Sequence, residues 1–318
     1  LTVPQLEQLM ATAALFGVHP SHAFTSVETS PEYADRPRLN VLKKAGVSRV
    51  SIGIQSFQDE ELKAIKRRPR QNTIYQALDD IRQMDFPYFN IDLIYGIKGQ
   101  TVESFLYSLE EALRFQPNEL FIYPLYVRQG TGITEREPDD VCFRMYRAAC
   151  KLLQAKGFLQ TSMRRFIHHP STDAEVSCGD EVMLSCGSGG RSYLGDLHYA
   201  TRYTVCQQCI AREIDEYMAT TDFTVARNGF ILSAKEQQQR FIIKNLMYYM
   251  GIDKAEYTRR FGEPLDRTPL FRQLAEQYWI EETPERIRLT PEGLGYSDYI
   301  GQLFITPEIR QLMETYSY

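Results

Sequence analysis

The sequence predicts an α/β fold in which parallel strands form a partial barrel and a small helical domain follows. Three apolar runs end in polar residues, at Glu28, Gln55 and Asp92, and the segments between them are long enough for a helix. The alternation of strand-like runs and helical patterns continues to about residue 170. Such alternation builds parallel sheets or barrels, and ligands bind at the carboxyl ends of their strands.

The expected elements of the barrel domain, residues 1–170, follow one another in a regular order. Apolar periodicity and turn residues predict helices at residues 4–17, 38–45, 59–66, 73–84, 102–115 and 140–156. The expected strands are residues 23–28, 49–55, 89–95, 120–127 and 158–166. Gly17 and Gly46 stand where C-terminal caps of two of the helices are needed.

Two further segments follow the barrel domain. Residues 171–230 are expected to form a separate segment, because their first part is rich in Gly, Ser and Cys and has little periodicity. Residues 231–318 are expected to form a small helical domain. Its strongest helix is predicted at residues 233–250, where Ser233 and Glu236 have capping-box spacing. Shorter helices and a hairpin-like wing are expected to follow.

Composition excludes several classes of function. The net charge of -5 over 318 residues argues against a general nucleic-acid binder, which usually carries a basic field. No apolar run approaches the length of a membrane span. The six cysteines have uneven spacing that is unlike a disulfide framework, so we expect a reducing, cytoplasmic setting. A leader before Leu1 stays open, because the sequence does not begin with Met.

Four polar residues near the expected rim suit a ligand that joins an amino acid to a nucleoside. Glu28 suits an ammonium group, whereas Gln55 and Asp92 suit ribose hydroxyls. Arg67 lies one helix beyond Gln55 and suits a carboxylate by bidentate pairing. Taken singly, each is more simply a strand-end cap or a solvated loop residue. The four together favour a binding site.

The motifs around these residues resemble one enzyme superfamily. E-T-S-P-E, R-V-S-I-G-I-Q-S-F, N-I-D-L-I-Y-G and K-G-Q-T resemble motifs of radical S-adenosylmethionine (SAM) enzymes of the oxygen-independent coproporphyrinogen III dehydrogenase superfamily. The similarity covers about residues 1–130, and the spacing of the four residues also agrees. The resemblance implies a partial (β/α)6 radical SAM barrel. It also implies that residues 171–230, with their glycine-rich part, cover SAM and the substrate.

The resemblance also assigns roles to this chain's residues. It implies that Glu28 holds the amino group of SAM, that Arg67 pairs with its carboxylate, and that Gln55 and Asp92 bind its ribose. Tyr123, on the next expected strand, would line the adenine and substrate side.

A [4Fe-4S] cluster is a further implication of the resemblance. Its Cys-x3-Cys-x2-Cys loop is expected before Leu1, together with two βα units, so we expect this sequence to be a truncated and inactive copy. A natural relative without a cluster is the alternative. Cys206 and Cys209 form a C-x-x-C motif, with Cys178 and Cys186 upstream, but as a metal site this is a weak signal.

A second group of candidates concerns heme. Arg191 can pair with a propionate, and glycines beside it let the backbone approach a ligand. Histidines can ligate iron or shuttle protons, although each alone is more simply a hydrogen-bonded loop residue. The glycine and histidine candidates are Gly189, Gly190, His168, His169 and His198.

Residues 178–193, C-G-D-E-V-M-L-S-C-G-S-G-G-R-S-Y, most resemble the heme-utilisation branch of the superfamily. Those enzymes, the anaerobilin synthases, are radical SAM methyltransferases that open the heme ring anaerobically and release iron. The resemblance implies heme as substrate and an electron donor such as a flavodoxin or a ferredoxin-type reductase. Two alternatives stay open: a heme chaperone that binds heme without turnover, and an oxygen-independent coproporphyrinogen III dehydrogenase.

Overall fold

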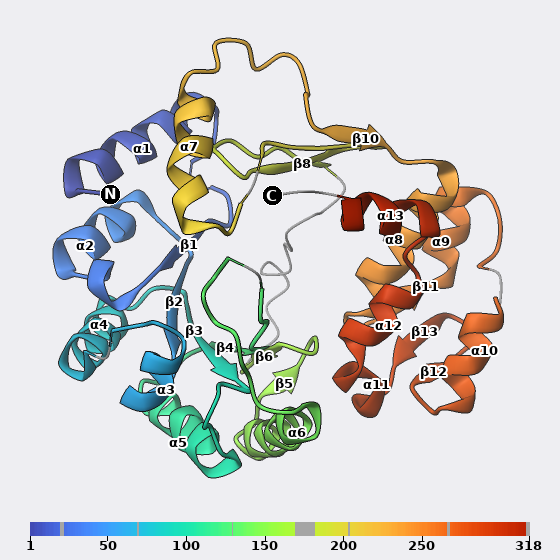
Figure 1. Cartoon of the computed structure of the whole chain (residues 1–318), viewed down its shortest axis with the longest axis horizontal. Helices are drawn as coiled ribbons and strands as arrows, with labels where there is room; N and C mark the ends of the chain where they lie inside the picture. Colours follow the sequence, from blue (N-terminus) through green and yellow to red (C-terminus); the bar gives the residue numbers. More distant parts are fainter. Residues whose placement is uncertain are drawn as a thin grey trace. The chain divides into compact units, whose positions relative to one another are not determined.

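The computed structural model describes residues 1–19, 22–68, 70–128, 130–168, 182–202, 204–265 and 268–315. The chain divides into two compact units. Unit 1 comprises Leu1–Val127 and Glu135–Ala174, and unit 2 comprises Arg128–Thr134 and Glu175–Tyr318. Figure 1 shows the elements of each unit.

Unit 1 is built on a six-stranded sheet of order β1-β2-β3-β4-β6-β5. Strands β1 to β4 are parallel to their neighbours, whereas β6 is antiparallel to β4 and β5. The strands are β1 (Ser26–Thr29), β2 (Arg49–Gln55), β3 (Tyr88–Tyr95), β4 (Glu119–Pro124), β5 (Leu159–Gln160) and β6 (Arg165–Ile167).

The helices of unit 1 are α1 (Val3–Leu15), η1 (Pro31–Tyr33), α2 (Arg36–Ala45), α3 (Asp59–Ala64), α4 (Gln71–Met84), α5 (Val102–Leu113) and α6 (Asp139–Ala155). Those from η1 to α5 connect the parallel strands, and α2 to α6 lie along the outer side of the sheet in Figure 1. The expected α/β fold is confirmed.

Local capping explains where several of the helices begin and end. Thr2, Asp35 and Thr101 each accept a hydrogen bond from a backbone N–H in the first turn of α1, α2 and α5. Gly46 ends α2 with φ of 84°, a left-handed conformation that glycine adopts at little cost.

The two faces of the parallel sheet differ in polarity, because side chains alternate along each strand. Val50, Ile52 and Ile54 of β2 are at most 2% exposed and face the helices. The alternate positions carry polar groups, including the buried Ser51 of β2 and Asn90 of β3. The apolar face forms the core of unit 1, so the polar face is available for a ligand site.

The single strand expected at residues 158–166 is wrong, because this region forms the antiparallel hairpin of β5 and β6. Ser162 creates the reversal. Its Oγ accepts hydrogen bonds from the backbone N–H groups of Arg164 and Arg165, at 3.3 and 3.1 Å. Such hydroxyl-to-backbone bonds stabilise a tight turn.

Unit 2 begins with a four-stranded antiparallel sheet of order β10-β9-β8-β7. Its elements are β7 (Val182–Met183), β8 (Arg191–Leu194), β9 (Leu197–Ala200), the helix α7 (Gln207–Met218) and β10 (Gly229–Ile231). The sequence analysis predicted no strand within residues 182–200, where periodicity is weak, so it missed β7, β8 and β9. Gly195, with φ of 65°, stands in the tight turn that pairs β8 with β9.

The rest of unit 2 is the expected helical domain with a small wing. It contains α8 (Ala234–Leu246), β11 (Ile252–Asp253), α9 (Lys254–Phe261), α10 (Pro269–Glu276), β12 (Ile280–Glu282), β13 (Arg286–Leu289), α11 (Pro291–Gly295), α12 (Ser297–Leu303) and α13 (Pro307–Thr315). The wing is the β12–β13 hairpin, and β11 pairs on its other edge. Buried aromatic and aliphatic side chains from α8 to α12 form the core of this domain.

Helix α8 is shorter than the helix expected at residues 233–250. The expected capping box is present, since Ser233 Oγ accepts from Glu236 N and Glu236 Oε2 accepts from Ser233 N. The helix ends at Leu246, before Gly251 packs tightly against the backbone of Ile287. Because Gly251 has φ of 68°, the chain turns there into β11.

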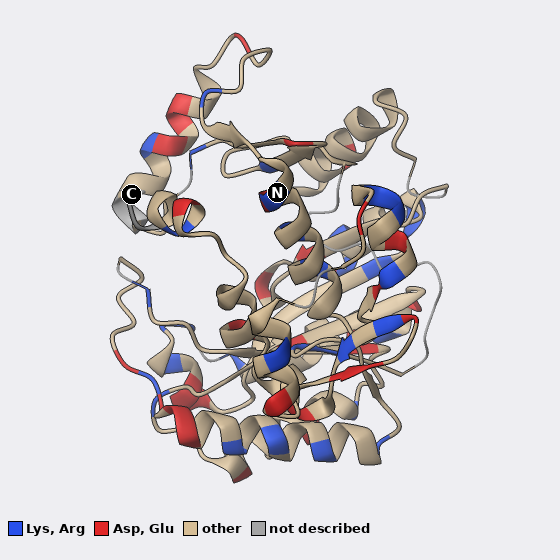
Figure 2. Ribbon diagram, turned by 90° about the vertical axis from the view of Figure 1, so that its right-hand side faces the viewer, with Lys and Arg blue, Asp and Glu red and all other residues tan. Residues whose placement is uncertain are grey.

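Charges are mixed along the ribbons of both units (Figure 2). Helix α6 has acidic residues in its first turn, Asp139 and Asp140, where they complement the helix dipole. In the part of the chain that the structure describes, no helix has the length and apolar character that a membrane crossing needs.

Candidate functional site

Strand register brings two carboxylates to the rim of unit 1. Glu28 of β1 is paired with Ser51 of β2, and Asp92 of β3 is paired with Gly53 of β2. The two acidic residues therefore flank the same short stretch of β2, near the carboxyl ends of the strands. This is the rim at which parallel α/β folds bind ligands.

Asp92 is held in an environment that disfavours its charge. Burial raises the pKa of Asp92 to about 6, and the charge of Glu28 raises it further. Hydrogen bonds oppose the increase: Asn90 Nδ2 donates to Asp92 Oδ1 at 2.7 Å, and Ser51 Oγ donates to Oδ2 at 3.4 Å. Asp92 therefore titrates close to neutral pH and gains from any further hydrogen-bond donor.

Tyr123 of β4 completes this side of the rim. Its ring stacks on Phe121, with centroids 5.8 Å apart and an angle of 12° between the planes. Burial raises the pKa of the Tyr123 phenol, and the charges of Asp92 and Glu28 raise it further. Tyr123 is thus neutral at pH 7 and lies within the electrostatic reach of both carboxylates.

Gln55, the last residue of β2, has an unusual backbone conformation at the rim. Its φ is 73°, in the left-handed region that non-glycine residues rarely adopt, and the register of β2 shifts between Gly53 and Gln55. A Cβ atom at Gly53 would lie 2.5 Å from Gln55 Nε2. The glycine therefore leaves room for the Gln55 amide to fold back over β2, next to the position paired with Asp92.

Arg67 is not brought into contact with these residues. It is exposed in the loop between α3 and α4, where its backbone N–H donates to Leu62 O at 2.8 Å. Its guanidinium makes no hydrogen bond or ion pair with the other residues that the structure describes. The expected pairing of Arg67 with the carboxylate of SAM stays a prediction.

Buried polar residues beneath the rim were missed by the sequence prediction. Asn90 Nδ2 also donates to Ser51 Oγ at 2.7 Å, while Asn90 Oδ1 is buried without a partner among the described residues. Deeper in the same face, Glu119 is 2% exposed and pairs with Arg49 at 3.1 Å and Arg165 at 2.6 Å. The sequence signal for buried polar residues on this face was the alternation between apolar and other residues in S-I-G-I-Q and N-I-D-L.

These side chains form the rim cradle: Glu28, Gln55, Asp92 and Tyr123. Carboxylates only accept hydrogen bonds when ionised, and Glu28 has no ion-pair partner in the described ranges. The cradle therefore fits a ligand that presents an ammonium group and hydroxyls, as SAM does.

The described residues do not fit a [4Fe-4S] cluster. They contain no group of three or more His, Cys, Asp or Glu side chains placed to hold a metal ion. Cys206 and Cys209 are close, with Sγ atoms 3.0 Å apart, but Cys178 lies outside the described residues. No step is therefore assigned to a cluster held by these residues.

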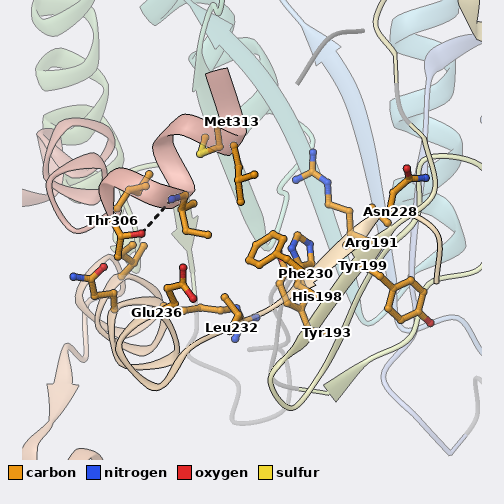
Figure 3. Close-up of a pocket in the computed structure, with 18 of the residues that line it drawn as sticks. Arg191, Tyr193, His198, Tyr199, Asn228, Phe230, Leu232, Glu236, Thr306 and Met313 are labelled. Atoms are coloured by element: carbon orange, nitrogen blue, oxygen red, sulfur yellow. Dashed lines mark hydrogen bonds between the residues drawn. The ribbon is translucent and has the colours of Figure 1, made fainter. Parts of the chain in front are cut away.

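A second candidate site is a cavity of about 1220 Å³ within unit 2 (Figure 3). Strands β8, β9 and β10 form one side, and α8 and α13 contribute to the other. The apolar lining residues include Leu232, Ile243, Phe304, Ile309 and Leu312. The cavity exceeds the roughly 300–1,000 Å³ that is usual for small-molecule sites.

Basic side chains predominate among the charged residues of this cavity. They are Arg128, Arg191, Arg227, Arg240 and Lys244, against a single acidic residue, Glu236, in the described lining. Arg240 also lies over the ring of Tyr193, 4.1 Å from its centroid. A large flat apolar ligand that carries carboxylates would match this combination.

His198 stands in the middle of the strand side of the cavity. On β9 it is paired with Tyr193 of β8 and with Phe230 of β10. Its ring stacks on Tyr193 at 4.2 Å and 4°, and meets Phe230 edge-on at 5.3 Å and 90°. Burial lowers the pKa of His198, and the charges of Arg191 and Arg240 lower it further. His198 Nε2 is buried with no hydrogen-bond partner among the described residues.

The structure gathers three of the expected heme candidates at this cavity, since Gly189, Arg191 and His198 line it. Gly190 instead packs in the turn before β8, where its backbone N–H donates to Gly187 O at 3.2 Å. His168 lies in unit 1 with its ring against Phe158, at 4.8 Å.

His169 lies outside the described residues. Two cavity residues that the sequence prediction missed are Tyr193 and Phe230, the cross-strand neighbours of His198.

Comparison with known proteins finds a match in each of two parts of the chain. Residues 3–112 match the Radical SAM superfamily, and residues 232–295 match the HemN C-terminal domain. These matches support the predicted superfamily, and the predicted α/β fold is confirmed.

Curated relatives are similar over most of the chain. The heme chaperone HemW of Bacillus subtilis is 26% identical over 295 residues, which cover 87% of this chain and 76% of the relative. The oxygen-independent coproporphyrinogen III oxidase of Thermostichus vulcanus is 25% identical over 291 residues, 84% of this chain and 89% of the relative. Their names correspond to the two alternatives of the sequence prediction.

A solved structure shares the fold. The coproporphyrinogen III oxidase (HemN) of Escherichia coli superimposes with a TM-score of 0.78 and 21% identity, over 96% of this chain and 75% of that chain. At this identity the likeness shows the fold alone. Assignment to the heme-utilisation branch therefore stays a proposal.

Proposed function

We propose that this protein binds SAM in the rim cradle and heme in the cavity of unit 2, and handles heme in the manner of a heme chaperone. The observation that carries the proposal is the cavity itself. Its apolar walls suit the flat face of a tetrapyrrole, and its basic side chains suit the propionates. Relatives named heme chaperone HemW support the same ligand.

The rim cradle would bind the amino-acid and ribose parts of SAM. Glu28 would accept hydrogen bonds from the ammonium group, while Asp92 and Gln55 would hold the ribose hydroxyls. Tyr123 offers an aromatic wall on the adenine side, and Arg67 would close on the carboxylate from its loop. SAM supplies the group-transfer or one-electron chemistry, and these residues orient it and exclude water.

Anaerobic opening of the heme ring by methyl transfer is a second candidate function. It is supported by the resemblance of residues 178–193 to the heme-utilisation branch, a stretch that includes the cavity residues Gly189 and Arg191. This candidate also needs an electron donor, such as a flavodoxin or a ferredoxin-type reductase. Both functions need the same two binding sites, so the fate of bound heme separates them.

The deciding experiment is an anaerobic incubation of the native gene product, reconstituted with iron and sulfide, with heme, SAM and a reductant. Bound heme with a persistent Soret band supports the chaperone function. Loss of the Soret band, with release of iron and a methylated linear tetrapyrrole, supports ring opening. Failure to bind heme, together with decarboxylation of coproporphyrinogen III, would overturn both.

A further inference from the structure

A buried carboxylate that neither binding site uses lies beside the ends of β2 and β3. It belongs to Glu61, in the first turn of α3, and this residue is 5% exposed. We propose that Glu61 is a positioning residue for SAM: it fixes the turn that follows β2 and so holds Gln55 in the conformation that binds the ribose. The inference rests on the proposed binding of SAM in the rim cradle, and it adds a residue that acts through Gln55 rather than on SAM itself.

Glu61 joins three segments around the strand ends. Its Oε2 accepts hydrogen bonds from Ser56 Oγ at 2.6 Å and from Gln100 Nε2 at 2.9 Å. Its Oε1 accepts from Ser104 Oγ in the first turn of α5. Ser56 follows the last residue of β2, and Gln100 also donates to Ile94 O of β3 at 3.2 Å. Because a carboxylate has lone pairs for all three donors, one side chain links the turn after β2 to the loop after β3.

Gln55 needs such a constraint because of its backbone conformation. Its φ of 73° is in the left-handed region, which a non-glycine residue keeps only where its surroundings impose it. The two residues after it are both held. Ser56 is fully buried and donates to Glu61, and the N–H of Phe57 donates to Ser108 Oγ at 3.1 Å. The turn is therefore fixed on the side away from the ligand, which leaves the Gln55 amide directed at the rim.

The bonds to Glu61 are of a strong kind. Hydrogen bonds to a carboxylate are shorter and stronger than those between neutral groups, and burial removes the water that would compete with them. The donor Ser56 is 0% exposed and the donor Gln100 is 3% exposed. No Lys or Arg among the described residues forms an ion pair with Glu61, so its charge depends on the three neutral donors. Removing the carboxylate should therefore loosen the turn and the loop together.

The test measures SAM affinity by equilibrium dialysis for the native protein, Glu61→Ala, Gln55→Ala and the double variant. We expect Glu61→Ala to bind SAM roughly tenfold more weakly. In the Gln55→Ala background the same change should alter SAM affinity by less than about twofold, because no amide is left to be positioned. Asp80→Ala is the matched control, since Asp80 is also 5% exposed but pairs with Arg36 at the start of α2. Its SAM affinity should stay within about twofold of the native value.

Two further variants keep the test decisive if Glu61→Ala fails to fold. Ser56→Ala removes the link between the turn and Glu61 by a much smaller change, and should weaken SAM binding by roughly threefold to tenfold. Glu61→Gln is the conservative variant. Its carbonyl oxygen can replace Oε2, and its amide can donate to Ser104 Oγ, whose proton can turn to Thr101 O at 3.2 Å. Glu61→Gln should therefore keep SAM affinity within about threefold of the native value.

Two results would overturn the positioning role of Glu61. One is native SAM affinity in both Glu61→Ala and Ser56→Ala. The other is an equal loss of SAM affinity with and without the Gln55 amide, which would show that Glu61 supports the fold and does not act through Gln55. In both cases the native protein still binds SAM, so the proposed SAM site stands. If the native protein itself binds no SAM, the proposed function fails instead.

Discussion

The charge of Glu28 acts on Asp92 across strand β2, although the two residues belong to different strands and are far apart in the sequence. Their strand partners on β2 are two small residues, Ser51 for Glu28 and Gly53 for Asp92. Two carboxylates at a strand rim, with no cation paired to Glu28 in the described residues, form an acceptor site that a ligand with ammonium and hydroxyl donors would complete.

Asp92→Asn should weaken SAM binding and stabilise the fold at pH 7. The pKa of Asp92 is raised from 3.8 to about 6, so folding at pH 7 keeps a charge that burial disfavours. Removing that charge should raise the free energy of unfolding by on the order of 1 kcal/mol. Thermal melts and SAM titration check both effects. A variant that is less stable and binds SAM normally would contradict the assignment.

The raised pKa of Asp92 should make both the stability of the fold and the affinity for SAM depend on pH. A carboxyl group with a raised folded-state pKa favours the folded state most at low pH, and this contribution is lost as pH rises from 3.8 towards 6. SAM affinity should change in the opposite direction and fall as pH drops through about 6, because the ionised carboxylate is the stronger acceptor. The pH profile of SAM binding should lose this step in Asp92→Asn.

Gly53→Ala should displace Gln55 and weaken SAM binding. A Cβ atom at residue 53 would lie 2.5 Å from Gln55 Nε2, the far end of a flexible side chain, so the fold can adapt. We expect SAM affinity to fall by roughly three- to tenfold, which is typical of one neutral hydrogen bond. Gly301→Ala is the matched control, because nothing lies within 4 Å of the added Cβ. Equal SAM affinity in both variants would remove Gln55 from the cradle.

Arg67→Ala should weaken SAM binding without affecting stability, because Arg67 is exposed and its guanidinium makes no hydrogen bond or ion pair with the other described residues. A hydrogen bond to a charged group contributes roughly 1.5–3 kcal/mol, so the loss should be about 10- to 100-fold. Arg68→Ala, one position along the same exposed loop, is the control. An unchanged SAM affinity for Arg67→Ala would show that this arginine has no part in binding.

Cys206 and Cys209 should form a disulfide when the protein is treated with oxidised glutathione. Their Sγ atoms are 3.0 Å apart, so the two sulfurs need to move little to form a bond. Cys142 and Cys150 should stay reduced, because burial raises the pKa of both thiols. Mass spectrometry should find the protein lighter by two hydrogens. Survival of both thiols under conditions that oxidise a small dithiol would argue against this pairing.

The strand rim could be predicted from the sequence because three apolar runs each carry a polar residue at or near their C-terminal end. These polar residues are Glu28, Gln55 and Asp92. This pattern cannot show that Gln55 adopts a positive φ, or that Gly53 makes room for its amide. Those features depend on the bulge in β2 and its register with β3.

The cavity of unit 2 was harder to predict, because its strands are short and irregular in sequence. Arg191 and His198 could be chosen by residue type, but their neighbours could not. The Gly195–Asp196 turn between two strand-like runs was the available signal, since a two-residue loop with glycine pairs Tyr193 with His198. Phe230 joins them from a distant segment, which no local pattern indicates.

The most direct test of the account is a crystal structure of the native protein with heme. The account predicts one heme in the cavity of unit 2, with its propionates beside Arg191 or the other basic side chains of the lining. Heme bound elsewhere, or no bound heme, would contradict it.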